Sequence, residues 1–391
     1  MVRKQFEVVQ RGIAQKQCGA YRTVSLNAAL LLAGMLPLDL RVREVASLYE
    51  AKKGVSLRKL SGREVERMAP ALEAPHPAER MSLEFISLHD QETLDRNSEH
   101  EIRIFTDGSR IEGKVGAALS LWRGGTETLT RKLALPVYST VYQAELLALC
   151  EATRIASKTK ATSFGVYSDS KAALQTIVNH GCLHPLAVET RRNIKSMSLQ
   201  GKVFTLHWIK AHAGLEGNER ADHLAKEAAV GSKKRPDYDL CPVSHVRRTI
   251  RMETLEVWNH RYATGSTAST TKIFFPDAVT AYRMIRKIVP RGTTTQFMTG
   301  HGGFSEYLTR FRCKEDPSCQ CEPGVPENVA HLILQCPINF LSRDPFREQE
   351  EVKGAPLEKS RQLCDVWFRS YQLLKLEFDS SAAILFLFQP S

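Results

Sequence analysis

The sequence lacks a hydrophobic run long enough to cross a membrane. Its most apolar stretch, residues 28–38, is interrupted by Pro37, whereas a membrane-spanning helix needs about 20 consecutive apolar residues. The N-terminal residues include basic side chains with no apolar run behind them, which is not the pattern of a secretory signal. We therefore expect a protein that is not exported and has no membrane partner.

The sequence also lacks a dense, even-numbered set of cysteines. The nine cysteines are an odd number spread over 391 residues, and only Cys313, Cys319, Cys321 and Cys336 are clustered. Disulfide frameworks are typical of short secreted chains with an even number of cysteines. The pattern favours a reducing, intracellular compartment.

Acidic residues are outnumbered by basic ones, and the excess is local. The chain carries 54 Lys and Arg against 43 Asp and Glu, and the surplus is largest between residues 231 and 300. Aromatic residues are interspersed in this basic stretch, namely Trp258, Tyr262, Phe274 and Phe275. Two interpretations fit: a surface that follows a phosphate backbone, or an ordinary solvated helical surface.

Between residues 102 and 230 the sequence alternates between strand-like and helical patterns. Strands are predicted at 102–106, 115–122, 126–135, 164–167 and 203–209, and helices at 140–156, 171–179, 186–197 and 219–230. Three successive strands followed by alternating helices and strands indicate a mixed five-stranded sheet with a hairpin meander and flanking helices. The fold class is therefore α/β.

Four acidic residues occupy distinctive places in this pattern. Asp107 and Asp169 each end a strand, which is where α/β sheets place functional groups. Glu145 lies on a largely apolar helix face, where an ionised carboxylate is costly unless a positive charge such as a metal ion compensates it. Asp222 lies in the first turns of the last helix. Taken singly, each acid also fits a turn, a helix surface or a helix first turn.

The four acids lie in the motifs Thr-Asp-Gly-Ser, Ala-Glu-Leu, Ser-Asp-Ser and Gly-Asn-Glu-Arg-Ala-Asp. In this order the motifs resemble the ribonuclease H family over residues 102–230. The resemblance implies an enzyme that cuts the RNA strand of RNA–DNA hybrids, with Asp107, Glu145, Asp169 and Asp222 holding two Mg²⁺ or Mn²⁺ ions. Carboxylate oxygens are better ligands for hard ions such as Mg²⁺ and Mn²⁺ than for zinc. The resemblance also gives His212 a role in proton transfer or product departure.

Three further residues are candidates for contacts with a hybrid. Gln143 is a candidate for the minor groove, and Ser109 and Ser170 for phosphate. Hybrid recognition relies on backbone shape and 2′-hydroxyls rather than on sequence, so we expect weak sequence preference. The same residue types also cap helices and form turns.

A second candidate site follows the basic stretch. Cys319, Cys321, His331 and Cys336 lie within eighteen residues, and three thiolates with one imidazole form the ligand set of a structural zinc ion. Alternatively, His331 is a buried helix residue with no metal, because it lies in an apolar helical segment. Cys313 is a substitute ligand.

The flanks resemble a particular kind of polyprotein. The layout of Gly300–Phe304, Tyr307–Phe311 and the cysteines is similar to the region after the ribonuclease H domain in arthropod non-LTR retrotransposon polyproteins of the R1/Jockey type. Residues 8–50 resemble the end of the reverse transcriptase of such elements. That polymerase carries an adjacent Asp-Asp pair, and no such pair occurs in this sequence, so we expect no polymerase site in this chain.

These observations predict an organisation and three candidate functions. The predicted segments are 1–70 (reverse transcriptase tail), 71–100 (linker), 101–231 (ribonuclease H domain), 232–300 (basic helical connector), 301–340 (zinc-knuckle-like) and 341–391 (helical tail). The first function is the hybrid ribonuclease, expected in the nucleus and also in the cytoplasm. The alternatives are a catalytically inactive nucleic-acid-binding remnant and a zinc-stabilised interaction module. The sequence predicts no oligomeric state.

Overall fold

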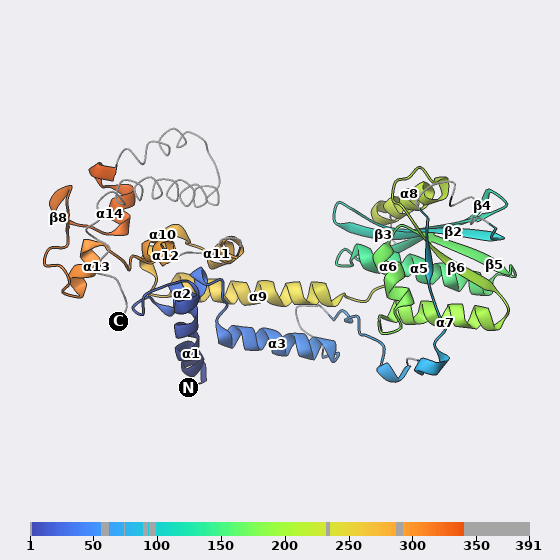
Figure 1. Cartoon of the computed structure of the whole chain (residues 1–391), viewed down its shortest axis with the longest axis horizontal. Coiled ribbons are helices and arrows are strands. Elements are labelled where there is room, and N and C mark those ends of the chain that lie inside the picture. Colours follow the sequence, from blue (N-terminus) through green and yellow to red (C-terminus); the bar gives the residue numbers. More distant parts are fainter. Residues whose placement is uncertain are drawn as a thin grey trace. The chain divides into compact units, whose positions relative to one another are not determined.

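The computed structural model describes residues 2–55, 62–73, 75–88, 93, 99–231, 235–286 and 292–339. They form two compact units, one from residues up to 46 and from 251 onward, the other from residues 47–250. Both units are shown in Figure 1. The predicted helical tail at 341–391 lies outside the described residues, and the predicted segment boundaries remain predictions.

The unit of residues 47–250 contains a six-stranded mixed sheet of order β1-β6-β5-β2-β3-β4. The strands are β1 (Phe85–Leu88), β2 (Ile102–Ile111), β3 (Lys114–Arg123), β4 (Thr126–Leu135), β5 (Ser163–Ser168) and β6 (Val203–Ile209). β2, β3 and β4 form an antiparallel meander, and β2, β5, β6 and β1 run parallel. The predicted α/β fold is confirmed, with one strand more than expected, because β1 joins the sheet edge from the segment interpreted as a linker.

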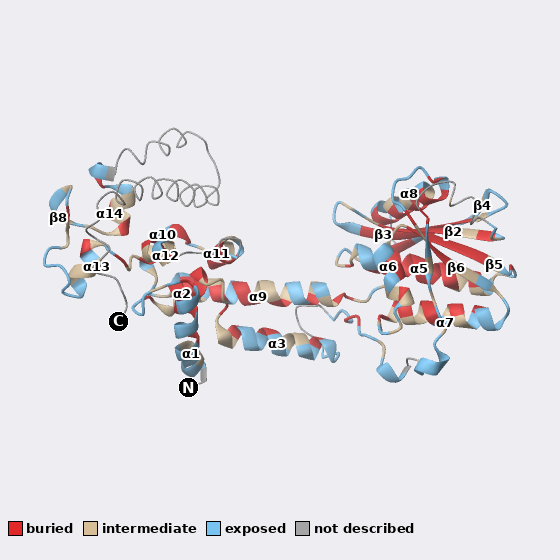
Figure 2. Cartoon of the chain, viewed as in Figure 1, coloured by how far each residue is buried: buried red, intermediate tan, exposed pale blue. Residues whose placement is uncertain are grey.

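Helices cover both faces of this sheet. They are α5 (Val141–Lys158), α6 (Lys171–Val178), α7 (Pro185–Leu199) and α8 (Glu216–Gly231). α8 lies on one face and α5, α6 and α7 lie on the other (Figure 1). Side chains of a strand alternate between faces, so Ile104 packs with α5 residues whereas Phe105 packs with Ala221 of α8. Strands β2, β3 and β5 are mostly buried, whereas most residues of the edge strand β4 are exposed (Figure 2).

The other unit is mainly helical. Its elements are α1 (Val2–Gln17), α2 (Leu26–Leu32), α10 (Ser269–Phe274), α11 (Ala278–Ile285), α12 (Gly292–Thr299), α13 (Ser305–Arg310), β7 (Ser318–Cys319), β8 (Glu322–Pro326) and α14 (Val329–Leu334). Two further helices, α3 (Leu38–Lys52) and α9 (Val243–Thr264), have residues in both units. One hydrophobic core joins α1 and α2 to α9–α12 and α14. No helix in the described ranges is long and apolar enough to span a membrane.

The aromatic residues of the basic stretch form part of this core. Trp258, Tyr262, Phe274 and Phe275 are each at most 4% exposed. Trp258 and Tyr262 lie one turn apart on α9, and spacing of four residues places side chains on one helix face. The interpretation in which these four rings contact nucleic acid is wrong, because the hydrophobic core takes them out of solvent.

Candidate active site

Two of the predicted acids meet where the parallel pairing of β2 with β5 ends. Asp107 does not end its strand as predicted, because β2 continues to Ile111 alongside β3. β2 pairs with β5 in a parallel register that sets Thr106 opposite Ser168. The next residue on each strand is an aspartate, Asp107 on β2 and Asp169 directly after β5. Parallel pairing therefore brings two carboxylates together at the edge of the sheet where α/β folds bind ligands.

Helix α5 adds the third carboxylate by packing tightly against β2. A Cβ atom on Gly108 would lie 2.6 Å from the backbone nitrogen of Glu145, so only glycine lets the helix approach this closely. Asp107, Glu145 and Asp169 each offer one carboxylate oxygen to a group whose atoms all lie within 4.8 Å of one another. The predicted site is assembled from three separate elements.

This close approach predicts that Gly108→Ala damages the site. The added methyl group must push α5 away from β2, and overpacking of this kind costs about 1–3 kcal/mol. We expect a lower melting temperature and weaker binding of divalent ions. Gly231→Ala is the matched control, since a Cβ there meets nothing within 4 Å. Equal melting temperatures for the two variants would contradict the packing argument.

Asp107 and Glu145 are buried, and the charge of Lys226 only partly offsets the effect of burial on Asp107. Asp107 and Glu145 are each 6% exposed, and Asp107 Oδ2 and Glu145 Oε2 have no hydrogen-bond partner. Burial, followed by the charges of Asp169 and Asp222, raises the pKa of Asp107 to about 7. Burial and the charges of Asp107 and Asp169 raise the pKa of Glu145 well above its usual value. Unpartnered carboxylate oxygens in such a cluster fit hard divalent cations, whose preferred ligands are oxygens.

Asp222 and His212 lie beside this group. Asp222 comes from α8, and its charge raises the pKa of both Asp107 and Asp169. Lys226 Nζ lies 2.6 Å from Asp222 Oδ2. His212 is exposed in the loop before α8 with φ of 53°, a left-handed conformation uncommon outside glycine. Its charge lowers the pKa of Asp169.

Two side chains that are not among the predicted site residues, Asn218 and Trp208, contact Asp169. Burial raises the pKa of Asp169, and a hydrogen bond from the Asn218 side chain opposes this effect. The indole Nε1 of Trp208 donates to the Asp169 carbonyl oxygen over 3.0 Å. Asn218 is 3% exposed and lies within the Gly-Asn-Glu-Arg-Ala-Asp motif, so its presence in that motif was the available signal.

The Cys/His residues form a second group in the helical unit. Cys319 ends β7, Cys321 lies in the turn before β8, and His331 and Cys336 come from α14 and the residues after it. Cys321 Sγ is 3.1 Å from His331 Nε2, and Cys319 Sγ is 3.8 Å from Cys336 Sγ. One ligand atom from each of the four lies within 4.8 Å of the others. Cys313 is exposed and is not part of this group.

The sheet unit is similar in sequence to known proteins. Residues 99–230 match the profile of the RNase H family. This part of the chain is an RNase H domain. The chain is 29% identical over 151 residues to a ribonuclease H from Pseudoalteromonas atlantica, a match that covers 35% of this chain and 95% of that protein. The domain is thus of the ribonuclease H enzyme type.

Two curated relatives extend the similarity beyond the RNase H domain. Both are Pol polyproteins of R1 retrotransposable elements. The Nasonia vitripennis protein is 34% identical over 90 residues, which cover 23% of this chain and 22% of that protein. The Popillia japonica protein is 27% identical over 236 residues, 58% of this chain and 87% of that protein. The chain thus spans about a fifth of the first relative's length.

Solved structures include similar RNase H domains. The N-terminal RNase H domain of a Mycobacterium tuberculosis protein covers 34% of this chain and 94% of its own, with 22% identity and a TM-score of 0.29. The RNase H1 of Halobacterium salinarum covers 32% and 96%, with 22% identity and a TM-score of 0.27.

The RNase H domain places the three predicted substrate-contacting residues differently. Ser109 is half-buried on β2. Ser170 precedes α6, and its side chain makes no capping hydrogen bond to that helix. Gln143 is 1% exposed, and its amide is bonded within the protein. The two serines are accessible in part, whereas Gln143 is an interior residue in this arrangement.

Proposed function

We propose that the RNase H domain hydrolyses the RNA strand of RNA–DNA hybrids with two divalent ions, Mg²⁺ or Mn²⁺. The observation that carries the proposal is the buried group of Asp107, Glu145 and Asp169 with its unpartnered oxygens. Such a group is costly as it stands and is matched to cations that favour oxygen ligands. Its position in an RNase H domain supports hybrid RNA as the substrate.

Each carboxylate has a distinct part in the proposed mechanism. Asp107, Glu145 and Asp169 would hold the ions, with Asp222 at the margin once Lys226 releases its carboxylate. When bound, two divalent ions supply the Lewis acidity for an in-line displacement at phosphorus. A water oxygen replaces the 3′ oxygen of the leaving strand, and the products carry a 5′-phosphate and a 3′-hydroxyl.

His212 is suited to moving a proton near this site. Its side chain is exposed on a loop, and its charge acts on Asp169. An imidazole ring nitrogen of His212 can take or give a proton as water attacks or the 3′-hydroxyl departs. The strained backbone at φ of 53° is consistent with a functional loop position.

Cleavage of labelled substrates tests the proposal. We expect the full-length chain to cut the RNA strand of an RNA–DNA hybrid in Mg²⁺ or Mn²⁺, and to leave double-stranded RNA and DNA intact. EDTA should abolish the cleavage. Well-folded protein that binds divalent ions but never cuts the hybrid would reject the enzyme and favour the inactive nucleic-acid-binding remnant.

The setting of this activity is a retroelement polyprotein. Similarity to two R1 Pol polyproteins supports this assignment. In that setting the hybrid is the product of reverse transcription, and we propose the nucleus as the place of action. A separate polymerase site is required, since the chain has no adjacent Asp-Asp pair.

We also propose that Cys319, Cys321, His331 and Cys336 bind one structural zinc ion. Four N and S ligand atoms in one group suit a closed tetrahedral zinc site. Burial and the neighbouring sulfurs of Cys319 and Cys336 raise the pKa of the Cys321 thiol, and a bound cation would remove this penalty. In the short hairpin of β7 and β8 and in helix α14, only Cys319, Val329 and His331 are buried. This small core would gain stability from a bound metal.

A further inference from the structure

A second buried carboxylate lies outside the candidate active site. Glu66, in the segment before the RNase H domain, is 7% exposed. Its Oε1 accepts hydrogen bonds from Gln143 Nε2 at 2.9 Å and from the Tyr238 hydroxyl at 2.6 Å, and His184 Nε2 lies 3.1 Å away. Burial alone raises the pKa of Glu66, but the contacts with His184, Tyr238 and Gln143 outweigh it and lower the pKa. The charged carboxylate is therefore a stable hydrogen-bond centre.

Glu66 belongs to a backbone clasp made of residues 64–69 and 237–241, which lie on either side of the matched domain. The Glu66 amide donates to the Cys241 carbonyl, and the Cys241 amide donates to the Glu64 carbonyl, both over 2.8 Å. The clasp is also fixed to the domain itself, since the Ala69 amide donates to the Leu183 carbonyl over 2.8 Å. Both flanking segments are thus part of the folded sheet unit.

The clasp reaches the first turn of α5 through Gln143. Both amide protons of Gln143 are used, one to Glu66 and one to the Leu240 carbonyl at 3.3 Å. Gln143 Oε1 accepts a hydrogen bond from the backbone N–H of Thr140 at 3.1 Å. Thr140 Oγ1 accepts one from the backbone N–H of Gln143, and the two bonds form a capping box. A side-chain amide has two donors and one acceptor oxygen, so Gln143 is fully committed.

Glu145 follows Gln143 by two residues on the same helix. Two residues correspond to about 200° around an α-helix, so Gln143 faces the clasp while Glu145 faces Asp107. Both residues are buried. Any shift of the first turn toward or away from the clasp therefore moves the Glu145 carboxylate relative to Asp107 and Asp169.

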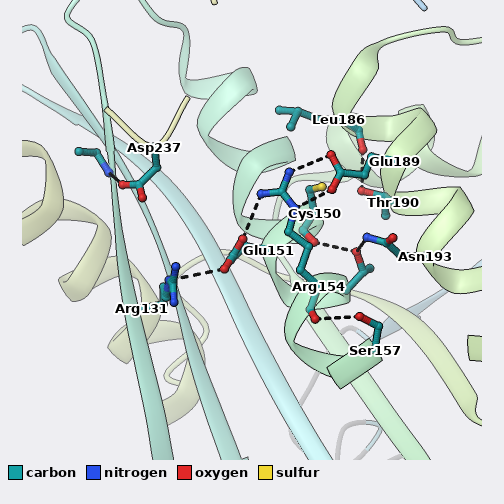
Figure 3. Close-up of polar contacts among 12 residues, drawn as sticks. Arg131, Cys150, Glu151, Arg154, Ser157, Leu186, Glu189, Thr190, Asn193 and Asp237 are labelled. Carbon is teal, nitrogen blue, oxygen red and sulfur yellow. Dashed lines mark hydrogen bonds and ion pairs between the residues drawn. The ribbon is translucent and has the colours of Figure 1, made fainter. Parts of the chain in front are cut away.

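The later turns of α5 are held independently. Arg154 forms a bidentate pair with Glu189 of α7, at 2.6 and 2.8 Å, and also bonds Glu151 at 3.1 Å. Glu151 pairs with Arg131 of β4 at 3.5 Å. Figure 3 shows these contacts around the last turns of the helix. The turn that carries Glu145 lies at the other end, where the clasp makes the contacts.

We propose that Glu66 is a positioning residue for the carboxylate site, holding Gln143 and, through the first turn of α5, the carboxylate of Glu145. This inference rests on the proposed function, since it makes residues outside the conventional domain part of the catalytic unit. It also explains why Gln143 is an interior residue here.

Binding of Mn²⁺ by the full-length chain tests this inference without nucleic acid. Calorimetric titration measures Mn²⁺ binding, and the signal that is lost in Asp107→Asn is the part that belongs to the carboxylate site. Groups that orient metal ligands typically change metal affinity by 10- to 100-fold when removed. We expect Glu66→Ala to weaken Mn²⁺ binding about tenfold and to lower kcat for hybrid cleavage, with KM for the hybrid within about twofold. Glu66→Gln, which keeps an acceptor oxygen, should restore most of the affinity.

Glu64→Ala is the matched control, because this carboxylate lies in the same segment but its side chain is 66% exposed. It should bind Mn²⁺ as the wild type does. A Glu66→Ala protein with unchanged Mn²⁺ affinity would overturn the inference, even if its melting temperature fell. If that variant does not fold, Tyr238→Phe removes one contact to Glu66, and two- to threefold weaker binding supports the inference whereas unchanged binding overturns it.

The two proposals fail in distinguishable ways. Wild-type protein that binds Mn²⁺ but does not cut the hybrid contradicts the proposed function, and the Glu66 variants still decide the positioning role. Wild-type protein with no Mn²⁺ isotherm dependent on Asp107 overturns both.

Discussion

Asp107→Asn is expected to abolish hybrid cleavage and to stabilise the metal-free protein at pH 8. The loss of a ligand to the catalytic ions should lower kcat by at least about 10³-fold. The gain in stability has a separate cause, since the substitution removes one of three clustered negative charges. Function and stability are thus opposed at this residue, as is common at strained active sites.

The expected gain in stability follows from the pH dependence of folding in the metal-free protein. The pKa of Asp107 is raised from 3.8 to about 7 in the folded protein, so between these values the folded state binds a proton that the unfolded state has released. Stability of the metal-free wild type therefore falls as pH rises from about 4 to 7. The raised pKa corresponds to roughly 4 kcal/mol of destabilisation by the charged carboxylate. Burying the polar Asn amide also costs free energy, so we expect Asp107→Asn to raise the free energy of unfolding by about 1–3 kcal/mol at pH 8.

Thermal unfolding in EDTA at pH 5 and pH 8 measures this effect. The melting temperature of Asp107→Asn should exceed that of the wild type at pH 8 and approach it at pH 5. Glu112→Gln neutralises an exposed carboxyl at the turn between β2 and β3 and should change neither stability nor cleavage. A lower melting temperature of Asp107→Asn at pH 8, or residual cleavage near the wild-type rate, would contradict the assigned role of this carboxylate.

Loss of the metal from the Cys/His group is expected to unfold the segment around it. Structural zinc contributes roughly 10–16 kcal/mol to small zinc-binding folds, and the segment of β7, β8 and α14 buries few apolar side chains, among them Val329. The full-length chain should carry one zinc ion. Cys336→Ser removes a ligand that is 1% exposed and should reduce the zinc content to near zero.

Native mass spectrometry and limited proteolysis check this result. Cleavage sites between residues 313 and 336 should become sensitive in Cys336→Ser and in chelated wild type. Cys313→Ser is the matched control, since Cys313 is exposed and outside the group, and it should keep its zinc. Wild-type protein purified without stoichiometric zinc, or equal zinc loss in both variants, would reject the zinc site and leave His331 as an ordinary buried histidine.

The acids were predictable because their signals are local. Asp169 follows a short strand as predicted, whereas Asp107 lies within β2, which continues to Ile111. The two acids still meet because the parallel pairing of β2 with β5 ends just before both of them. Glu145 was recognisable as a carboxylate on an apolar helix face. Periodicity and strand ends depend on a few consecutive residues, so such positions can be located without knowing the rest of the fold.

Contacts between distant segments were not predictable in this way. The sequence makes Gln143 a candidate for minor-groove contacts, but its partners are Glu66 and the Leu240 carbonyl, which lie 77 and 97 residues away in the sequence. Strand β1 was missed because an edge strand of four residues has little pattern of its own. Trp258 and Tyr262 were interpreted in the context of neighbouring charges, whereas the core that covers them is built partly from α1 and α2.

The sequence by itself determined the α/β class of the RNase H domain and marked the four acids and the four Cys/His residues as candidate metal ligands, because residue type and spacing encode strands, helix faces and ligand chemistry. Only the tertiary structure decided which side chains lie in solvent and which carboxylates share a low-dielectric site. Burial and electrostatic coupling depend on atoms brought together from distant parts of the chain. Glu66 became visible for that reason alone, because its partners come from three separate segments.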